Sequence, residues 1–281
     1  MIYERPVIRA VGDYIVSVEF SDQVNMSVCF RALATAEAVR ARRLPGVYDV
    51  QPTTRSIGLF YDRAETTFDR LREEIAPVIE EAAAARSLRS RLVQVPVWYD
   101  DPWSVEVAAQ NGLSSNIEFV AELNGLTVTE VIDRHSGAEH LITLTAAPPG
   151  NHAAYPLTDI ALFAPKYDQP RTFTPARAVA MAGRATCIYP TDSPGGYQLL
   201  GRAAVDTYDP GNRSGIAPAD GVLFAAGDRL RYRSVGPLEY EEIWNKVREG
   251  AYDYQVQEEV IDIDDYLATL ESGQSGASGE A

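Results

Sequence analysis

The first 95 residues alternate between two hydrophobic patterns. Five short runs are typical of strands: 7–13, 14–21, 47–52, 55–62 and 92–100. Residues 24–43 and 65–86 instead carry apolar side chains at helical spacing. Gly12-Asp13, between the first two runs, favours a tight hairpin turn. The order of these elements predicts a ferredoxin-like α+β sandwich over residues 1–98.

Short helices and then short strands are expected next. Residues 102–135 contain helical patterns, in which Thr127 and Glu130 have the spacing of a capping box. After residue 139 the helical period fades, and short apolar runs separated by proline and glycine indicate strands up to about residue 236. Many short strands with such turns are typical of a β-barrel or a β-sandwich. We therefore expect a second domain at 99–236, with short helices at its start.

The end of the chain has a different pattern. Residues 238–249 form one amphipathic helical segment that Gly250 ends. The following residues, up to 271, are acidic and partly apolar, so they either pack as an arm on another subunit or stay solvated. We treat 237–271 as a C-terminal helix with an acidic extension. Residues 272–281 are rich in serine and glycine and are predicted to be disordered.

The composition of the 281 residues is that of a globular protein, with 46% hydrophobic and 23% charged residues. No apolar run is long enough to span a membrane, and the N-terminus lacks the apolar region of a signal peptide, so we expect a cytoplasmic protein. The net charge of −15 argues against nucleic acid and anionic lipid as partners, because both attract clustered lysine and arginine. Cys29 and Cys187 are the only cysteines, and their isolation predicts reduced thiols.

Two segments carry candidate chemistry. In SPGGYQLLGR, the glycines Gly195 and Gly196 either allow a ligand to approach the backbone or simply form a hairpin turn. In residues 164–175, Lys166 and Arg171 place two cations close together in an otherwise acidic chain. Lysine and arginine together suit a carboxylate or a carboxylated nitrogen. The alternative for this second segment is an ordinary surface loop.

The histidines give no metal-binding pattern. His135, His140 and His152 lack the spacing of zinc ligands, so we expect no metal site. His152 lies in a segment rich in proline and glycine, where it is either a general base or, more commonly, a solvated loop side chain. Cys187 lies in a predicted strand and is expected to be a small buried residue rather than a nucleophile.

Four stretches resemble a known family. They are SNIEFVAELNGL (115–126), KYDQPRTFTPARAVAMAG (166–183), CIYPTDSPGGYQLLGR (187–202) and GDRLRYRSV (227–235). They are similar to the allophanate hydrolase subunit 1 family, also called the 5-oxoprolinase B-subunit or kinase-inhibitor family. Within that family, the chain most resembles the C-terminal part of the carboxyltransferase domain of urea carboxylase. The tail EEIWNKVREGAYDYQVQEEVIDIDDYLATL looks like that branch as well.

The resemblance implies a fold, a reaction and partners. The fold is an N-terminal α+β domain followed by a cyclophilin-like β-barrel. The reaction is transfer of CO₂ from carboxybiotin to a urea- or amide-like acceptor, in a cleft shared with a homologous cyclophilin-like partner subunit. Biotin would be attached to a separate carrier and charged by a biotin carboxylase, which uses ATP and bicarbonate. The chain would be one piece of this assembly, not active alone.

The resemblance also nominates site residues. The candidates for catalysis are Lys166 and Arg171, which would bind carboxylate or ureido oxygens, and Tyr197, which would shape the pocket. The candidates for substrate binding are Tyr167, Thr172, Tyr189, Ser193, Gly195, Gly196 and Gln198.

One segment departs from the family pattern and keeps other functions open. The basic residues expected before Lys166 are replaced by Asp159, Ile160, Ala161 and Leu162, and an expected asparagine is Asp168. The first alternative is the B subunit of an ATP-dependent lactamase of 5-oxoprolinase type, which needs no biotin. Another is a regulatory subunit that binds a histidine kinase without catalysis. The last is a scaffold whose catalytic residues all lie on the partner.

Overall fold

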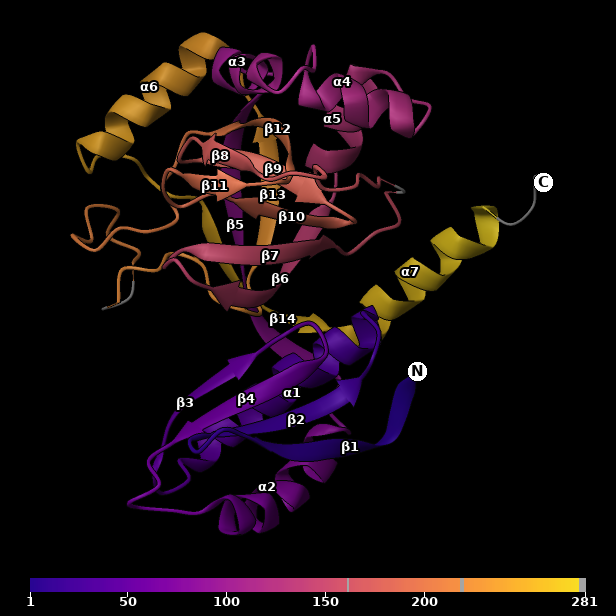
Figure 1. Ribbon diagram of the computed structural model, residues 1–281, viewed down its shortest axis with the longest axis vertical. Coiled ribbons are helices and arrows are strands. Elements are labelled where there is room, and N and C mark those ends of the chain that lie inside the picture. The colour runs from indigo at the N-terminus through magenta and orange to yellow at the C-terminus, as the bar shows by residue number, and fades with distance from the viewer. Residues whose placement is uncertain (161, 218–219, 278–281) are drawn as a thin grey trace.

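The computed structural model describes residues 1–160, 162–217 and 220–277, with side chains up to residue 270 (Figure 1). The chain forms an N-terminal unit and a larger barrel, stacked along the long axis of the molecule. A C-terminal helix projects beside the junction of these two bodies.

The N-terminal unit is a four-stranded sheet with two helices. Its elements are β1 (Ile2–Val11), β2 (Ile15–Ser21), α1 (Met26–Arg42), β3 (Val47–Pro52), β4 (Ser56–Tyr61) and α2 (Phe68–Ala82). The strands are antiparallel in the order β1-β2-β4-β3, and both helices bury apolar side chains against the sheet. The α+β sandwich predicted for this region is confirmed.

Local signals explain these elements. Gly12, at φ +61°, makes the turn between β1 and β2. The Asn25 side chain accepts a hydrogen bond from the Ser27 N–H at the start of α1, and Arg43 ends that helix in the left-handed region. Thr67 caps α2 by accepting from the Arg70 N–H.

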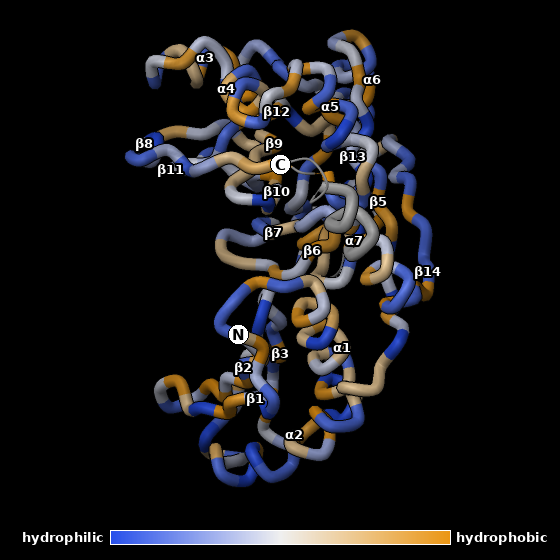
Figure 2. The backbone as a smooth tube through the Cα atoms, turned by 90° about the vertical axis from the view of Figure 1, so that its right-hand side faces the viewer, coloured by the Kyte–Doolittle hydropathy of each residue, from blue (hydrophilic) through white to orange (hydrophobic). Residues whose placement is uncertain are grey.

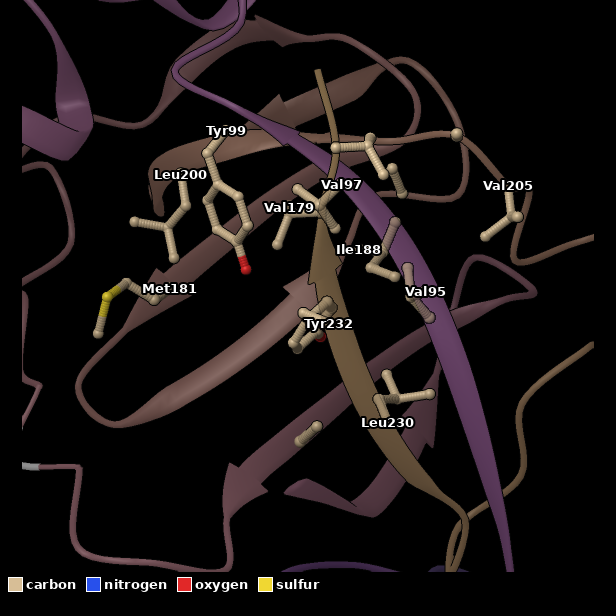
Figure 3. Packing of buried hydrophobic residues seen from close by; sticks show 14 of the residues in the cluster. Val95, Val97, Tyr99, Val179, Met181, Ile188, Leu200, Val205, Leu230 and Tyr232 are labelled. Atoms are coloured by element: carbon tan, nitrogen blue, oxygen red, sulfur yellow. The ribbon is translucent and has the colours of Figure 1, made fainter. Parts of the chain in front are cut away.

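A closed seven-stranded barrel forms the second body. Its strands are β5 (Ser87–Tyr99), β6 (Glu139–Ala146), β7 (Asn151–Pro156), β9 (Ala178–Ala182), β10 (Ala185–Ile188), β12 (Gln198–Ala203) and β13 (Arg229–Ser234). Their order is β12-β9-β10-β7-β6-β13-β5, and pairing of β12 with β5 closes the barrel. Its interior is filled by apolar side chains such as Val95, Val179 and Leu230 (Figure 3). The predicted barrel is therefore confirmed.

β5 differs from the sequence expectation. The alternation of apolar residues in β5 predicts a strand, and the domain boundary expected after residue 98 makes it the last strand of the N-terminal unit. It pairs instead with β13 in parallel and antiparallel with β12 and with β14 (Val256–Asp262), so it is a barrel strand. The period of a strand is the same in either sheet, and only long-range pairing decides between the two.

Helices and one two-stranded ribbon surround the barrel. The helices are α3 (Pro102–Gln110), α4 (Asn116–Leu123), α5 (Val128–Ser136) and α6 (Pro237–Arg248). The capping box predicted for α5 is present, with Thr127 and Glu130 bonding reciprocally. β8 (Arg171–Thr174) and β11 (Ser193–Gly195) form a separate antiparallel two-stranded ribbon that protrudes from the barrel (Figure 2).

The acidic extension folds back onto its own chain. β14 (Val256–Asp262) pairs antiparallel with β5, and α7 (Ile263–Ala277) follows it directly. Ile261 and Ile263 are buried against the start of the barrel and α1. The extension is therefore not a solvated tail but an edge strand and a helix that pack on this chain. The predicted disordered tail overlaps the end of α7, and residues 278–281 lie outside the described residues.

Within the described part of the chain, no helix is both long and apolar enough to cross a membrane.

Candidate functional site

A cleft of about 830 Å³ lies on the outer face of the barrel. Side chains of β7 alternate there: Asn151, Ala153 and Tyr155 line the cleft, whereas Ala154 belongs to the barrel core. Ala185 and Cys187 of β10 extend the lining, and Ile188 points inward. The site therefore lies outside a fully packed barrel.

Six of the nominated residues meet in this cleft. They are Lys166, Tyr167, Tyr189, Gly195, Gly196 and Tyr197. The first two come from the segment before β8, and the others come from the stretch between the end of β10 and the start of β12, which includes β11. Thr54 reaches the cleft from the N-terminal unit. The two candidate segments of the sequence thus form one site.

Backbone and side-chain contacts hold the two segments together. The Tyr167 N–H donates to the Gly196 carbonyl at 2.8 Å. The Tyr167 hydroxyl donates to Oδ1 of Asn116, at the start of α4, at 2.6 Å. A Cβ on Gly195 would lie 2.7 Å from Cζ of Tyr189, so glycine is needed there for space. Neither Gly195 nor Gly196 has a positive φ.

Lys166 is the only lysine, arginine or acidic residue among the described residues that line the cleft. Its Nζ lies 5.1 Å from the centre of the Tyr197 ring, within the range of a cation–π contact. The phenols of Tyr155 and Tyr189 complete a set of hydroxyl groups around the same space. This arrangement suits an anion held by one positive charge and several hydroxyl donors.

The tyrosines remain neutral donors at physiological pH. Burial raises the pKa of Tyr189 to about 12, and it also raises the pKa of Tyr155 and Tyr197. Burial likewise raises the pKa of the Cys187 thiol to about 12, so that thiol is not a nucleophile. The sequence prediction for Cys187 agrees with this.

Arg171 is not among the described residues that line the cleft. It is 4% exposed and lies behind the cleft lining, where its Nη2 donates to the Tyr197 carbonyl at 2.9 Å. Its guanidinium carbon lies 4.7 Å from the centre of the Tyr167 ring. Arg171 therefore positions two residues that line the cleft, Tyr167 and Tyr197. Sequence reasoning locates the Arg171 guanidinium in the correct segment, but it does not predict that the side chain points away from the cleft.

Three other nominated residues also lie outside the lining of the cleft. Thr172 is exposed on β8, and Ser193 is half-buried on β11 opposite Thr174. Gln198 is buried, and its Nε2 donates to the Pro165 carbonyl at 3.0 Å. Gln198 thereby fixes the residue that precedes Lys166.

His152 is not the solvated loop side chain that the sequence favours. It lies on β7, is 3% exposed, and packs edge-on against Phe224 with ring centres 5.7 Å apart. His152 is among the residues that line the cleft, but its buried ring packs against a residue of the barrel core, so it is not placed as a general base there. His135 and His140 pack inside the barrel around Tyr232.

No group of three or more histidine, cysteine, aspartate or glutamate side chains in the described parts of the chain is arranged to hold a metal ion. Tyr155 is one of the cleft residues that sequence reasoning missed, and it brings a hydroxyl group to the lining. The sequence could indicate Tyr155 only through its position in the strand that follows Gly150. Which face of that strand carries Tyr155 depends on the residue at which β7 begins.

The family model described as carboxyltransferase domain, subdomain C and D, matches residues 6–218, and the chain belongs to this family. Among curated proteins, the 5-oxoprolinase B subunit of Bacillus subtilis is 25% identical over 83% of this chain and 94% of its own length. The urea amidolyase of Lachancea kluyveri is 26% identical over 92% of this chain but only 15% of its own length. The chain thus matches one relative nearly end to end and a small part of the other.

Solved structures agree with the fold. The urea amidolyase of K. lactis superimposes with a TM-score of 0.83 at 21% identity, covering 98% of this chain and 18% of that protein. TTHA0988 superimposes with a TM-score of 0.62 at 29% identity, covering 82% of this chain and 41% of that one. The chain is therefore carboxyltransferase-like and is related to both urea carboxylase and the 5-oxoprolinase B subunit.

Proposed function

We propose that this chain is the carboxyltransferase subunit of a biotin-dependent enzyme similar to urea carboxylase, which transfers CO₂ to a urea- or amide-like nitrogen. The observation that carries the proposal is the isolated charge of Lys166 in a cleft lined by phenols and small apolar residues. The family match and the urea amidolyase relative support the same reaction class.

The lining of the cleft fits a carboxylated ureido group. Carboxybiotin, when bound, supplies the activated carboxyl group. Lys166 provides the counter-charge for its carboxylate, and no acidic side chain among the described lining residues opposes that charge. The hydroxyls of Tyr155 and Tyr197 lie in the same cleft as hydrogen-bond donors for oxygens that gain charge. Ala153, Ala185 and Cys187 offer a poorly hydrated surface beneath them.

The proton of the acceptor nitrogen needs a base from elsewhere. The described lining holds no aspartate or glutamate, and the ring of His152 is directed into the barrel. A base from a homologous partner subunit would complete the site, with a biotin carboxylase using ATP and bicarbonate to charge the carrier. The chain would then be inactive alone.

Lys166→Ala tests this function in the complex reconstituted with its partner subunits. We expect bicarbonate- and urea-dependent ATP hydrolysis to fall by about 100-fold, as when one preorganised charge is removed from an active site. Lys166 is exposed, so the variant should keep the circular dichroism spectrum and melting temperature of the natural chain. Lys246→Ala, which removes the only other lysine, from α6, is the matched control. Unchanged turnover in Lys166→Ala would refute the role of this lysine.

A lactamase of 5-oxoprolinase type is the second candidate, because the Bacillus subtilis relative matches over 94% of its own length. It predicts ATP-dependent opening of 5-oxoproline that avidin does not inhibit. Avidin-sensitive turnover with urea or another amide supports the carboxyltransferase instead.

A further inference from the structure

A small pocket lies where the C-terminal helix α7 meets the N-terminal unit. It has a volume of about 220 Å³, below the range that holds drug-sized ligands. Residues from β1, α1, the end of α2 and the start of α7 surround it. Figure 1 shows the start of α7 beside α1. The larger apolar residues and the alanine of α1 that line the pocket are Ile2, Val28, Phe30, Ala34, Ile263 and Leu267.

Arg31 brings a positive charge without a counter-ion to this pocket. Its Nε is buried and has no hydrogen-bond partner among the described residues. Burial lowers the pKa of its guanidinium, and no carboxylate in the described part of the chain acts to raise it. The guanidinium carbon lies 5.0 Å from the centre of the buried Phe20 ring, but that contact supplies no anion. A half-buried charge without a partner is unfavourable, so the pocket favours a negatively charged occupant.

The other two charges that line the pocket neutralise each other. Nε of Arg86 lies 3.3 Å from Oδ2 of Asp264, the second residue of α7. Asp264 therefore has its own cation, and the charge of Arg31 is left in excess.

We infer that this pocket binds a small aliphatic carboxylate, whose oxygens accept hydrogen bonds from the Arg31 guanidinium and whose alkyl group packs against Phe30 and Leu267. A guanidinium presents its N–H groups in a fork that matches the two oxygens of a carboxylate. The apolar walls favour an alkyl group, because its burial removes apolar surface from water. Ile2 is 50% exposed, so the pocket opens to solvent.

The pocket is separate from the cleft that holds Lys166. The two share no lining residue among the described parts of the chain. The inference therefore goes beyond the proposed function and does not depend on it.

The groove that contains Arg40 is a weaker candidate for an anion. Nη2 of Arg40 donates to the Val50 carbonyl, and the carboxylates of Asp49 and Glu37 raise the pKa of its guanidinium. Arg40 thus already has the partners that Arg31 lacks.

Ligand binding in the pocket would be coupled to the position of the C-terminal extension. Ile263 and Leu267 of α7 line the pocket and also pack with Phe30 of α1. A ligand that binds only while α7 is docked stabilises the docked state. We therefore expect a bound carboxylate to slow cleavage of α7 by protease.

Calorimetric titration of the full chain with butyrate tests the inference. We expect saturable binding of butyrate and at least about tenfold weaker binding of butyramide, which has the same shape but no charge. Arg31→Met should also weaken butyrate binding by at least about tenfold. Arg63→Met is the matched control, because it removes an exposed arginine paired with Asp13 at the surface, and it should bind butyrate as the natural chain does.

The ligand-free variant separates a binding role from a structural one. Arg31→Met should keep the melting temperature within about 3 °C of the natural value, because the charge that it removes has only the ring of Phe20 as a partner. Any one of three results would overturn the assignment: no saturable binding of butyrate, equal affinity for butyramide, or equal affinity in Arg31→Met. Tighter binding of phosphate than of butyrate would also overturn it, since the alkyl group would then contribute nothing. The comparison of ligands uses the natural chain, so it decides the question even if Arg31→Met fails to fold.

Discussion

Two adjacent glycines at the cleft have different surroundings. A side chain on Gly195 would overlap the Tyr189 ring, whereas the nearest atom to a side chain on Gly196 would be 3.8 Å away. We expect Gly195→Ala to lower the free energy of unfolding by about 1–3 kcal/mol, because the half-buried Tyr189 ring must move. Gly196→Ala should change it by less than about 0.5 kcal/mol. Urea denaturation of both variants measures the difference, and equal effects would contradict this account of Gly195.

The same displacement has a functional consequence. Tyr189 lines the cleft, so moving its ring changes the shape of the site. In the reconstituted complex, Gly195→Ala should lose more activity than Gly196→Ala under conditions where both variants are folded.

At the scale of elements, Arg229 fastens the C-terminal extension to the barrel. Its side chain is 2% exposed and forms ion pairs with Glu139 of β6 and Glu259 of β14. It also donates to Ser90 of β5 at 3.1 Å and to Tyr266 of α7 at 2.7 Å. One buried guanidinium therefore joins four elements.

Arg229→Met should destabilise the protein by about 3 kcal/mol, because it removes one of the two arginine partners of the partly buried Glu139 and the ion pair with Glu259. We also expect faster cleavage by protease within β14 and α7. Arg233→Met is the control, since the Arg233–Glu239 pair is exposed and should contribute less than about 1 kcal/mol. Equal protease resistance in the two variants would show that Arg229 does not hold the extension.

At the scale of the whole molecule, burial keeps three histidines uncharged. Burial lowers the pKa of His140 and of His152 to about 4, and it lowers the pKa of His135 as well. The unfolded chain takes up these protons near pH 6.5. The contribution of these neutral histidines to the free energy of unfolding is therefore complete above about pH 6.5. It is lost as the pH falls from there towards 4.

We expect the free energy of unfolding to fall by on the order of 1 kcal/mol per pH unit for each such histidine in that range. His140→Leu isolates one contribution, because neither ring nitrogen of His140 has a hydrogen-bond partner in the described structure. This variant should reduce the slope between pH 6 and 4.5, as measured by urea denaturation. An unchanged slope would mean that His140 is not a buried neutral group.

The sequence by itself determined the elements with local causes. The turn at Gly12, the capping box at Thr127 and Glu130, and the ends of α1 and α6 depend on residues within a few positions of each other. It also identified the two segments that form the cleft, because their residue types are unusual in this chain. The hydrogen bond that joins these segments, from Tyr167 to Gly196, has no local signal.

The tertiary structure alone decided which way these residues face. Arg171 lies behind the cleft lining, His152 points into the barrel, and Tyr155 points into the cleft. Shifting a strand by one residue exchanges its two faces, so the face on which a side chain lies depends on the register of the strand. That register is set by partner strands far away in sequence. Pairing with strands far away in sequence also places β5 in the barrel and β14 beside it. No local pattern in the sequence contains these contacts.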